Sequence, residues 1–233
     1  MRYCMDSITI YQRLHSIENE VDKLSNTIFA LKNTDMEKHG ANYEKLSTDA
    51  ALCAERIACR LRNLIRIMDL TGKSDYMKEA VQALGIQVSF EDDILSVTLP
   101  GLFPKRRIRS STAFLHDPLH YALKEFFTDH EVAPFKECVI CFCLVYDREL
   151  PQRRIKDYDN MELKLILDVI SSYTLFDDSG LYCDAHHTTE LGETDQTIIY
   201  IMEKDKFPDW LGNRMKTKNT LSENIRFSQF LRR

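Results

Sequence analysis

The first third of the chain carries a seven-residue repeat of apolar positions. From Ile10 to Leu31 the apolar residues follow one another in alternating steps of four and three, the spacing that brings them onto one side of a helix. Polar and charged residues occupy most positions between them. The pattern predicts a coiled-coil helix with an apolar seam of Ile10, Leu14, Ile17, Val21, Leu24, Ile28 and Leu31.

A second helical pattern follows a polar connection that contains Gly40. Its apolar side consists of Leu46, Ala50, Cys53, Ile57, Leu61, Leu64 and Met68. Because the connection is short, we expect the two helices to fold back as an antiparallel hairpin. The sequence leaves four roles open for this hairpin: a dimer interface, a partner-binding arm, a clamp on DNA, or an added layer on its own domain.

Beyond residue 85, short strand patterns alternate with helical ones. Strands are predicted over residues 86–90, 94–99, 137–146, 181–191 and 197–202. Helices are predicted over residues 117–128 and 161–173, the first opening at Asp117-Pro118. Together these elements predict an α+β fold with a mixed sheet and flanking helices, preceded by the helical hairpin.

Composition narrows the class of protein. The chain is 44% hydrophobic and 29% charged, as is usual for soluble globular proteins. No run is long enough to cross a bilayer and residues 1–16 lack the apolar stretch of a signal peptide, so we expect a cytoplasmic protein without membrane contact. There is no Gly-rich loop to hold phosphates, which argues against a nucleotide cofactor.

The seven cysteines form an odd, scattered set, which indicates reduced thiols. Cys138, Cys141 and Cys143 have spacings that suggest zinc binding, but they lie in a continuous apolar run without a second ligand pair. The run is typical of a central strand buried on both faces.

Acidic residues cluster in the second half of the chain. Asp157 and Asp159 are two residues apart, so their side chains leave an extended segment on the same side. Asp177 and Asp178 follow the next helical run. If these segments meet, the carboxylates require a divalent cation, and hard oxygen ligands suit Mg²⁺ or Mn²⁺. Each motif alone also has an ordinary interpretation, as a solvated loop, a helix cap at Asn160 or a turn.

The order of these motifs resembles the RusA family of Holliday-junction resolvases. The resemblance covers about residues 93–205 and rests on Asp157-Tyr158-Asp159-Asn160, a helix with Lys164 and Asp168, and Asp177-Asp178. It implies a dimeric, Mg²⁺-dependent endonuclease that cuts branched DNA in recombination and repair. The implied catalytic residues are Asp157, Asp159, Asp178 and Lys164, and the implied metal ligands are Asp157, Asp159, Asp177 and Asp178, with Asp168 in support.

One spacing departs from the family. The lysine normally follows the second aspartate of the motif by four residues, whereas Lys164 follows Asp159 by five. An added residue turns a helical side chain by about 100°. Either the start of the helix is distorted, or Lys164 points away from the acidic residues.

Charge is unevenly distributed along the chain. Residues 1–90 are balanced, residues 91–205 carry 12 basic and 22 acidic side chains, and residues 206–233 carry seven basic and two acidic ones. Two basic clusters nevertheless lie beside predicted strand ends, where a phosphate backbone would approach. The candidate DNA contacts are Lys105, Arg106, Arg107, Arg153, Arg154 and Lys156. The alternative is that both clusters lie in solvated loops.

These patterns predict three regions: a helical hairpin over 1–85, a RusA-like nuclease domain over 86–206, and a basic tail over 207–233 that contacts nucleic acid or packs on a neighbour. The leading hypothesis is a Mg²⁺-dependent endonuclease acting on branched DNA. One alternative is an inactive RusA-like module that binds nucleic acid or supports assembly through the hairpin. Another is a coiled-coil adaptor with a coincidental acidic motif.

Overall fold

The computed structural model describes residues 7–67, 73–103, 113–151, 155, 157–158, 161 and 163–214. The chain divides into two compact units. The first contains the described residues up to Leu84 together with those of 103–122 and 159–169, and the second contains the β-sheet. One boundary between the units lies between Leu84 and Gly85, and residues 113–122 and 163–169 group with the hairpin.

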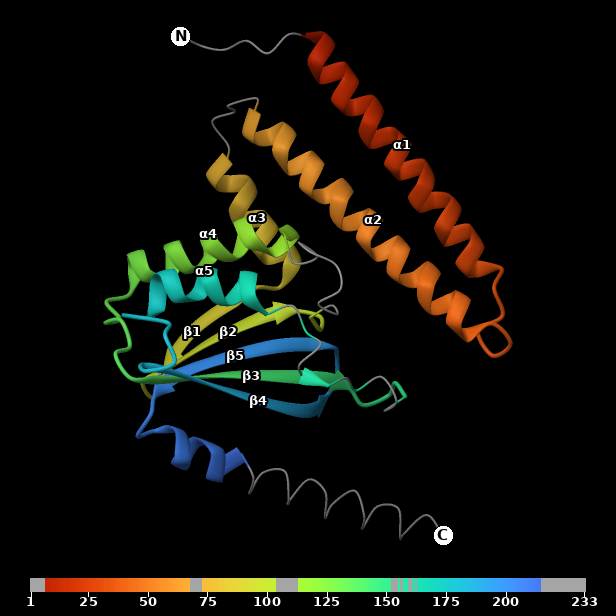
Figure 1. Cartoon of the computed structure of the whole chain (residues 1–233). Coiled ribbons are helices and arrows are strands. Elements are labelled where there is room, and N and C mark those ends of the chain that lie inside the picture. Colours follow the sequence, from red (N-terminus) through yellow and green to blue (C-terminus); the bar gives the residue numbers. More distant parts are fainter. Residues whose placement is uncertain are drawn as a thin grey trace, which may run out of the picture. The chain divides into compact units, whose positions relative to one another are not determined.

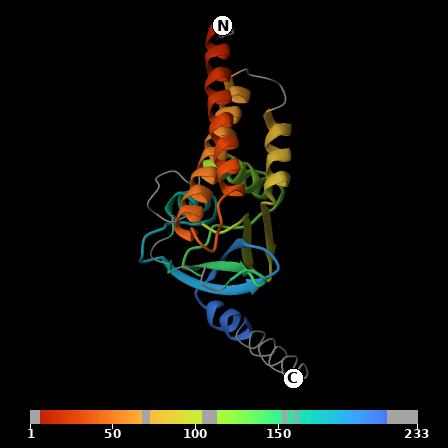
Figure 2. The ribbon, with the colours of Figure 1, turned by 90° about the vertical axis from the view of Figure 1, so that its right-hand side faces the viewer.

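The predicted hairpin is formed by α1 (Ser7–Lys32) and α2 (Gly40–Ile67), which lie side by side in both views (Figures 1 and 2). The connection is tight because the Asp35 carboxylate accepts the backbone N–H groups of Glu37 and Lys38 at 3.0 and 3.2 Å. A short helix, α3 (Lys73–Leu84), completes the described N-terminal part and buries Met77 and Ala80.

Only half of the α1 seam is covered. One set of seam positions is buried or half-buried, and consists of Ile10, Ile17, Leu24 and Leu31. The alternate set is exposed: Leu14 retains 44%, Val21 46% and Ile28 53% of its accessible surface. A seven-residue repeat therefore faces α2 with one of its two apolar rows and solvent with the other.

The sheet has the strand order β1-β2-β5-β3-β4, with β1 (Gln87–Glu91), β2 (Ile94–Pro100), β3 (Cys138–Asp147), β4 (Cys183–Gly192) and β5 (Gln196–Glu203) (Figure 1). β3 and β4 are parallel, and the other neighbours are antiparallel. The predicted α+β class with a mixed sheet is confirmed. The β1–β2 turn is the predicted one, and Asp92 and Asp93 adopt the positive φ angles, 53° and 58°, that such hairpin turns require.

β3 is an inner strand of the sheet, between β5 and β4, and is buried on both faces as the cysteine run predicts. Cys141 and Cys143 are fully buried and Cys138 is 1% exposed. Because side chains alternate along a strand, Cys138 lies on one face of the sheet and Cys141 and Cys143 on the other. The cysteines are structural residues of the sheet, as their apolar context predicted.

Two helix starts differ from the sequence prediction. α4 (Ala113–Asp129) begins four residues before Asp117 and contains Pro118 inside the helix. The added turn buries Leu115 one turn before Leu119, at 2% and 0% exposure, and this apolar burial outweighs the hydrogen bond that proline cannot donate.

α5 (Lys164–Thr174) begins three residues later than Met161. Met161 is buried at 5% exposure, but it lies outside the helix. The apolar run therefore contains a non-helical segment followed by a helix. α4 and α5 each pass from one unit to the other, and none of the described helices is both long and apolar enough to span a membrane.

Candidate functional site

The acidic motif is anchored to the sheet through Tyr158. The Tyr158 hydroxyl lies 2.7 Å from Thr189 Oγ1 on β4, and its ring stacks on His187 with centroids 5.2 Å apart. Burial, and then the neighbouring His186, lowers the pKa of His187, which favours the neutral ring in this stack. Asp157, the preceding residue, is exposed. Sequence reasoning overlooked Tyr158, although an aromatic hydroxyl between two aspartates is a recognisable anchor.

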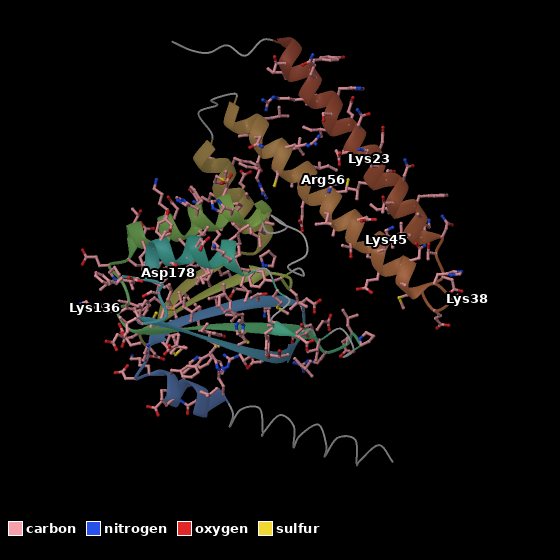
Figure 3. All side chains as sticks on the ribbon, in the orientation of Figure 1. Lys23, Lys38, Lys45, Arg56, Lys136 and Asp178 are labelled. Carbon is pink, nitrogen blue, oxygen red and sulfur yellow. The ribbon has the colours of Figure 1, made fainter. Side chains whose placement is uncertain are left out.

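The second acidic pair forms a turn at the start of β4. Asp177 Oδ1 accepts the Ser179 backbone N–H at 2.7 Å, and this bond lowers the pKa of Asp177. The Ser179 carbonyl in turn accepts the N–H groups of Tyr182 and Cys183, both at 3.0 Å. Asp178 is exposed and lies at the end of the sheet marked by Lys136, where β3 begins (Figure 3). The ordinary interpretation of Asp-Asp-Ser-Gly as a turn is therefore confirmed.

The two acidic segments are attached at opposite ends of β4. Asp178 precedes Cys183, whereas Tyr158 contacts Thr189, six residues further along the strand and thus roughly 20 Å away. Oxygen ligands of one Mg²⁺ lie about 2.1 Å from the ion. The structure thus does not bring Asp157 and Asp178 together, and the described residues contain no group of three or more His, Cys, Asp or Glu side chains able to hold a metal ion.

The remaining predicted site residues lie elsewhere or outside the description. Lys164 is the first residue of α5 and is exposed, as is Asp168 one turn later. Because the helix begins only at Lys164, the additional residue of the motif falls before the helix rather than within it. Outside the described residues lie Asp159, Asn160, Lys105, Arg106, Arg107, Arg153, Arg154 and Lys156.

A polar cluster covers the sheet face that carries Cys143. The helical segment 207–214 packs there, with Trp210 against Tyr200 at 5.1 Å between ring centroids. The Arg214 guanidinium lies over both rings, at 4.9 and 4.6 Å, pairs with Glu190 and donates to Cys143 Sγ at 3.1 Å. The first part of the predicted basic tail therefore packs on its own sheet.

A carboxylate on α1, that of Glu20, joins the two helices of the hairpin. Glu20 is 9% exposed and pairs with Lys23 at 3.2 Å and with Arg56 of α2 at 3.3 Å (Figure 3). The hydrogen bond from Lys23, with further ones from Cys53 and Arg56, lowers the pKa of Glu20 although burial opposes this. In contrast, burial raises the pKa of Glu55 to about 7, against a smaller opposing effect of Arg56.

Comparison with known proteins identifies the family of the chain. Residues 6–225 match a family of unknown function, DUF6100, so the protein belongs to that family. No curated protein matches the chain. The match spans both the helical hairpin and the sheet.

Proposed function

We propose that the protein is a RusA-like nucleic-acid-binding module that assembles through its helical hairpin and does not cut DNA by itself. The observation that carries this proposal is the separation of Asp157 from Asp178 along β4. Asp157 and Asp178 are too far apart to share one ion within a single chain, so no catalytic step is derived from such an ion.

The exposed row of α1 supports assembly. Leu14, Val21 and Ile28 form one stripe, which Tyr11 and Phe29 widen at 78% and 70% exposure. The two aromatic side chains alone offer about 300 Å² of accessible surface per copy, a substantial part of the roughly 800 Å² that each partner of a stable interface buries. An apolar stripe of this length on a surface helix indicates a binding partner.

A second copy of the chain fits the stripe. Val21 lies at its midpoint, so a two-fold axis through Val21 places Leu14 of one copy opposite Ile28 of the other in an antiparallel pair. The same axis brings Tyr11 beside Lys32, a favourable cation–π pair, and keeps the two Glu18 carboxylates apart. A parallel pair would place both Glu18 side chains at one level.

A metal-dependent endonuclease is the second candidate. It is favoured by the exposure of Asp157 beside the anchored Tyr158, which leaves a carboxylate accessible at one end of the sheet. In this case Asp157 and Asp159, without Asp178, would be the essential carboxylates.

A synthetic four-way junction with Mg²⁺ separates the two candidates. The wild-type chain and its Asp157→Asn, Asp159→Asn and Asp178→Asn variants are incubated with the junction and with a linear duplex of the same sequence. The proposed module binds the junction in preference to the duplex and yields no product. Cleavage lost in Asp157→Asn and Asp159→Asn but retained in Asp178→Asn would establish the endonuclease instead. Absence of junction binding would exclude both and favour the adaptor.

A further inference from the structure

A pocket lies between the two helices of the hairpin, on the covered side of α1. It has a volume of about 210 Å³ and is lined by Arg13, Ser16 and Ile17 of α1 and by Arg60 and Asn63 of α2. Ile17 is buried at 7% exposure and supplies an apolar wall, whereas the other four side chains carry hydrogen-bonding groups. A volume of this size has room for one small polyatomic ion.

The charges around the pocket are unbalanced. Two guanidinium groups line it, and no carboxylate does. Arg60 donates to the Ser16 hydroxyl at 2.6 Å and to the Ser16 carbonyl at 3.4 Å, both neutral acceptors. Arg13 makes no hydrogen bond or ion pair with any residue that the structure describes. Two like charges facing one pocket raise the electrostatic potential there and favour an anion.

The buried carboxylate nearest the pocket along α1 already has cationic partners. Glu20 pairs with Lys23 and Arg56, at 3.2 and 3.3 Å. Glu20 therefore does not compensate the charge of the two arginines of the pocket. Its pair with Arg56 joins α1 to α2, and Arg13 and Arg60 line the pocket from these two helices.

The donor set fits a phosphate group. Each guanidinium presents a planar fork of N–H donors, and Asn63 and Ser16 add an amide and a hydroxyl. Donors from two helices suit a tetrahedral anion, which accepts hydrogen bonds in several directions, and arginine forks bind phosphate oxygens in pairs.

We propose that the α1–α2 pocket binds a phosphate group, with Arg13 and Arg60 as its principal ligands. The group belongs either to a nucleic-acid backbone or to a free phosphate. The site stands independently of the proposed assembly, because its lining residues lie on α2 and on the side of α1 that faces α2, and none belongs to the exposed stripe.

Binding measurements on the full-length chain test the site. Inorganic phosphate is titrated by calorimetry, and a fluorescent four-way junction and a single-stranded oligonucleotide are titrated by anisotropy at several salt concentrations. The decisive variant is Arg13→Gln, because it leaves the Arg60–Ser16 contact intact. Arg60→Gln is the second variant. Lys45→Gln, which removes one exposed charge near the connection between the helices (Figure 3), is the matched control. Circular dichroism tests whether each variant is folded.

The proposal predicts that Arg13→Gln and Arg60→Gln each weaken binding of at least one probe roughly tenfold, whereas Lys45→Gln changes it less than twofold. If the ligand is a nucleic-acid backbone, the slope of log K against log salt also decreases by about 1 in each arginine variant. Loss confined to inorganic phosphate identifies a free phosphate as the ligand. The site is refuted if none of the three probes binds, or if both arginine variants behave like Lys45→Gln.

Discussion

Replacing Val21 by aspartate tests whether two copies meet on the exposed stripe of α1. In either orientation of a two-fold pair, Val21 of one copy faces Val21 of the other, so one substitution introduces two facing carboxylates. Aspartate is too short to reach solvent along the helix surface, and its helix propensity is close to that of valine. The hairpin itself should therefore remain folded.

Two contributions determine how much Val21→Asp should weaken the dimer. Two unit charges about 6 Å apart repel by roughly 0.7 to 3 kcal/mol, depending on how far water penetrates. Val21 retains 46% of its accessible surface in the single chain, so pairing buries about half a side chain per copy, worth roughly 1 kcal/mol each. Together these losses amount to about 3 to 5 kcal/mol, which corresponds to a dimer dissociation constant raised about 100-fold or more.

Sedimentation velocity over a concentration series measures this shift. The control is Asn26→Asp, which adds the same charge to an exposed position of α1 outside the stripe with almost no change in shape. The wild type and the control should dimerise alike, and Val21→Asp should remain monomeric over most of the range. A monomeric wild type, or equal weakening by both substitutions, would refute the reasoning.

Three further predictions concern stability and reactivity. The raised pKa of Glu55, about 7 against an ordinary 4.5, means that the folded state holds the proton more tightly, so stability should decline as pH rises from about 4.5 through 7. The full pKa shift corresponds to a change of roughly 3 kcal/mol in the free energy of unfolding, and solvent screening of this half-exposed group reduces it to about 1 kcal/mol. Urea titrations at pH 5 and 8 measure this decline in stability, and Glu55→Gln should remove it. The hydrogen bond from Cys138 lowers the pKa of Cys183, so iodoacetamide should alkylate Cys183 before Cys138, and mass spectrometry showing the reverse order would contradict this. Gly192→Ala should destabilise the fold by about 1 to 3 kcal/mol, because the new methyl group would collide with a buried valine side chain, whereas Gly180→Ala, with open space around it, should change the unfolding free energy by less than about 0.5 kcal/mol.

Local sequence patterns predicted the α1–α2 hairpin and strand β3 well, because each of them has a strong pattern of apolar residues. The seven-residue repeat specified the hairpin, and the continuous apolar run specified the buried strand β3. The repeat did not specify which apolar row faces α2, since both rows have the same spacing. That choice is made by contacts distant in sequence, such as Glu20 with Arg56.

Helix starts were less predictable because tertiary burial competes with local signals. Pro118 marks a favourable first turn, yet the burial of Leu115 extends α4 beyond it. Met161 continues the apolar run of α5, yet it is buried outside the helix. In both cases the apolar residue is buried, but its backbone conformation differs from the predicted one. Leu115 is helical although the helix was expected to begin at Asp117, and Met161 is non-helical although it was expected to begin α5.

The acidic residues show how topology limits an inference from spacing. A helix that joins two parallel strands returns the chain to the end of the sheet where the first strand began. Residues that follow β3 and residues that precede β4 therefore lie at opposite ends, and this arrangement separates Asp157 from Asp178 whatever the number of residues between them. The strand–helix–strand order in the sequence already contained this constraint once β3 and β4 are taken as parallel neighbours. A metal centre within one chain must consequently draw its ligands from one end of the sheet. If the wild-type chain cleaves the junction, retained cleavage in Asp178→Asn therefore assigns the metal site to the end of the sheet that carries Asp157.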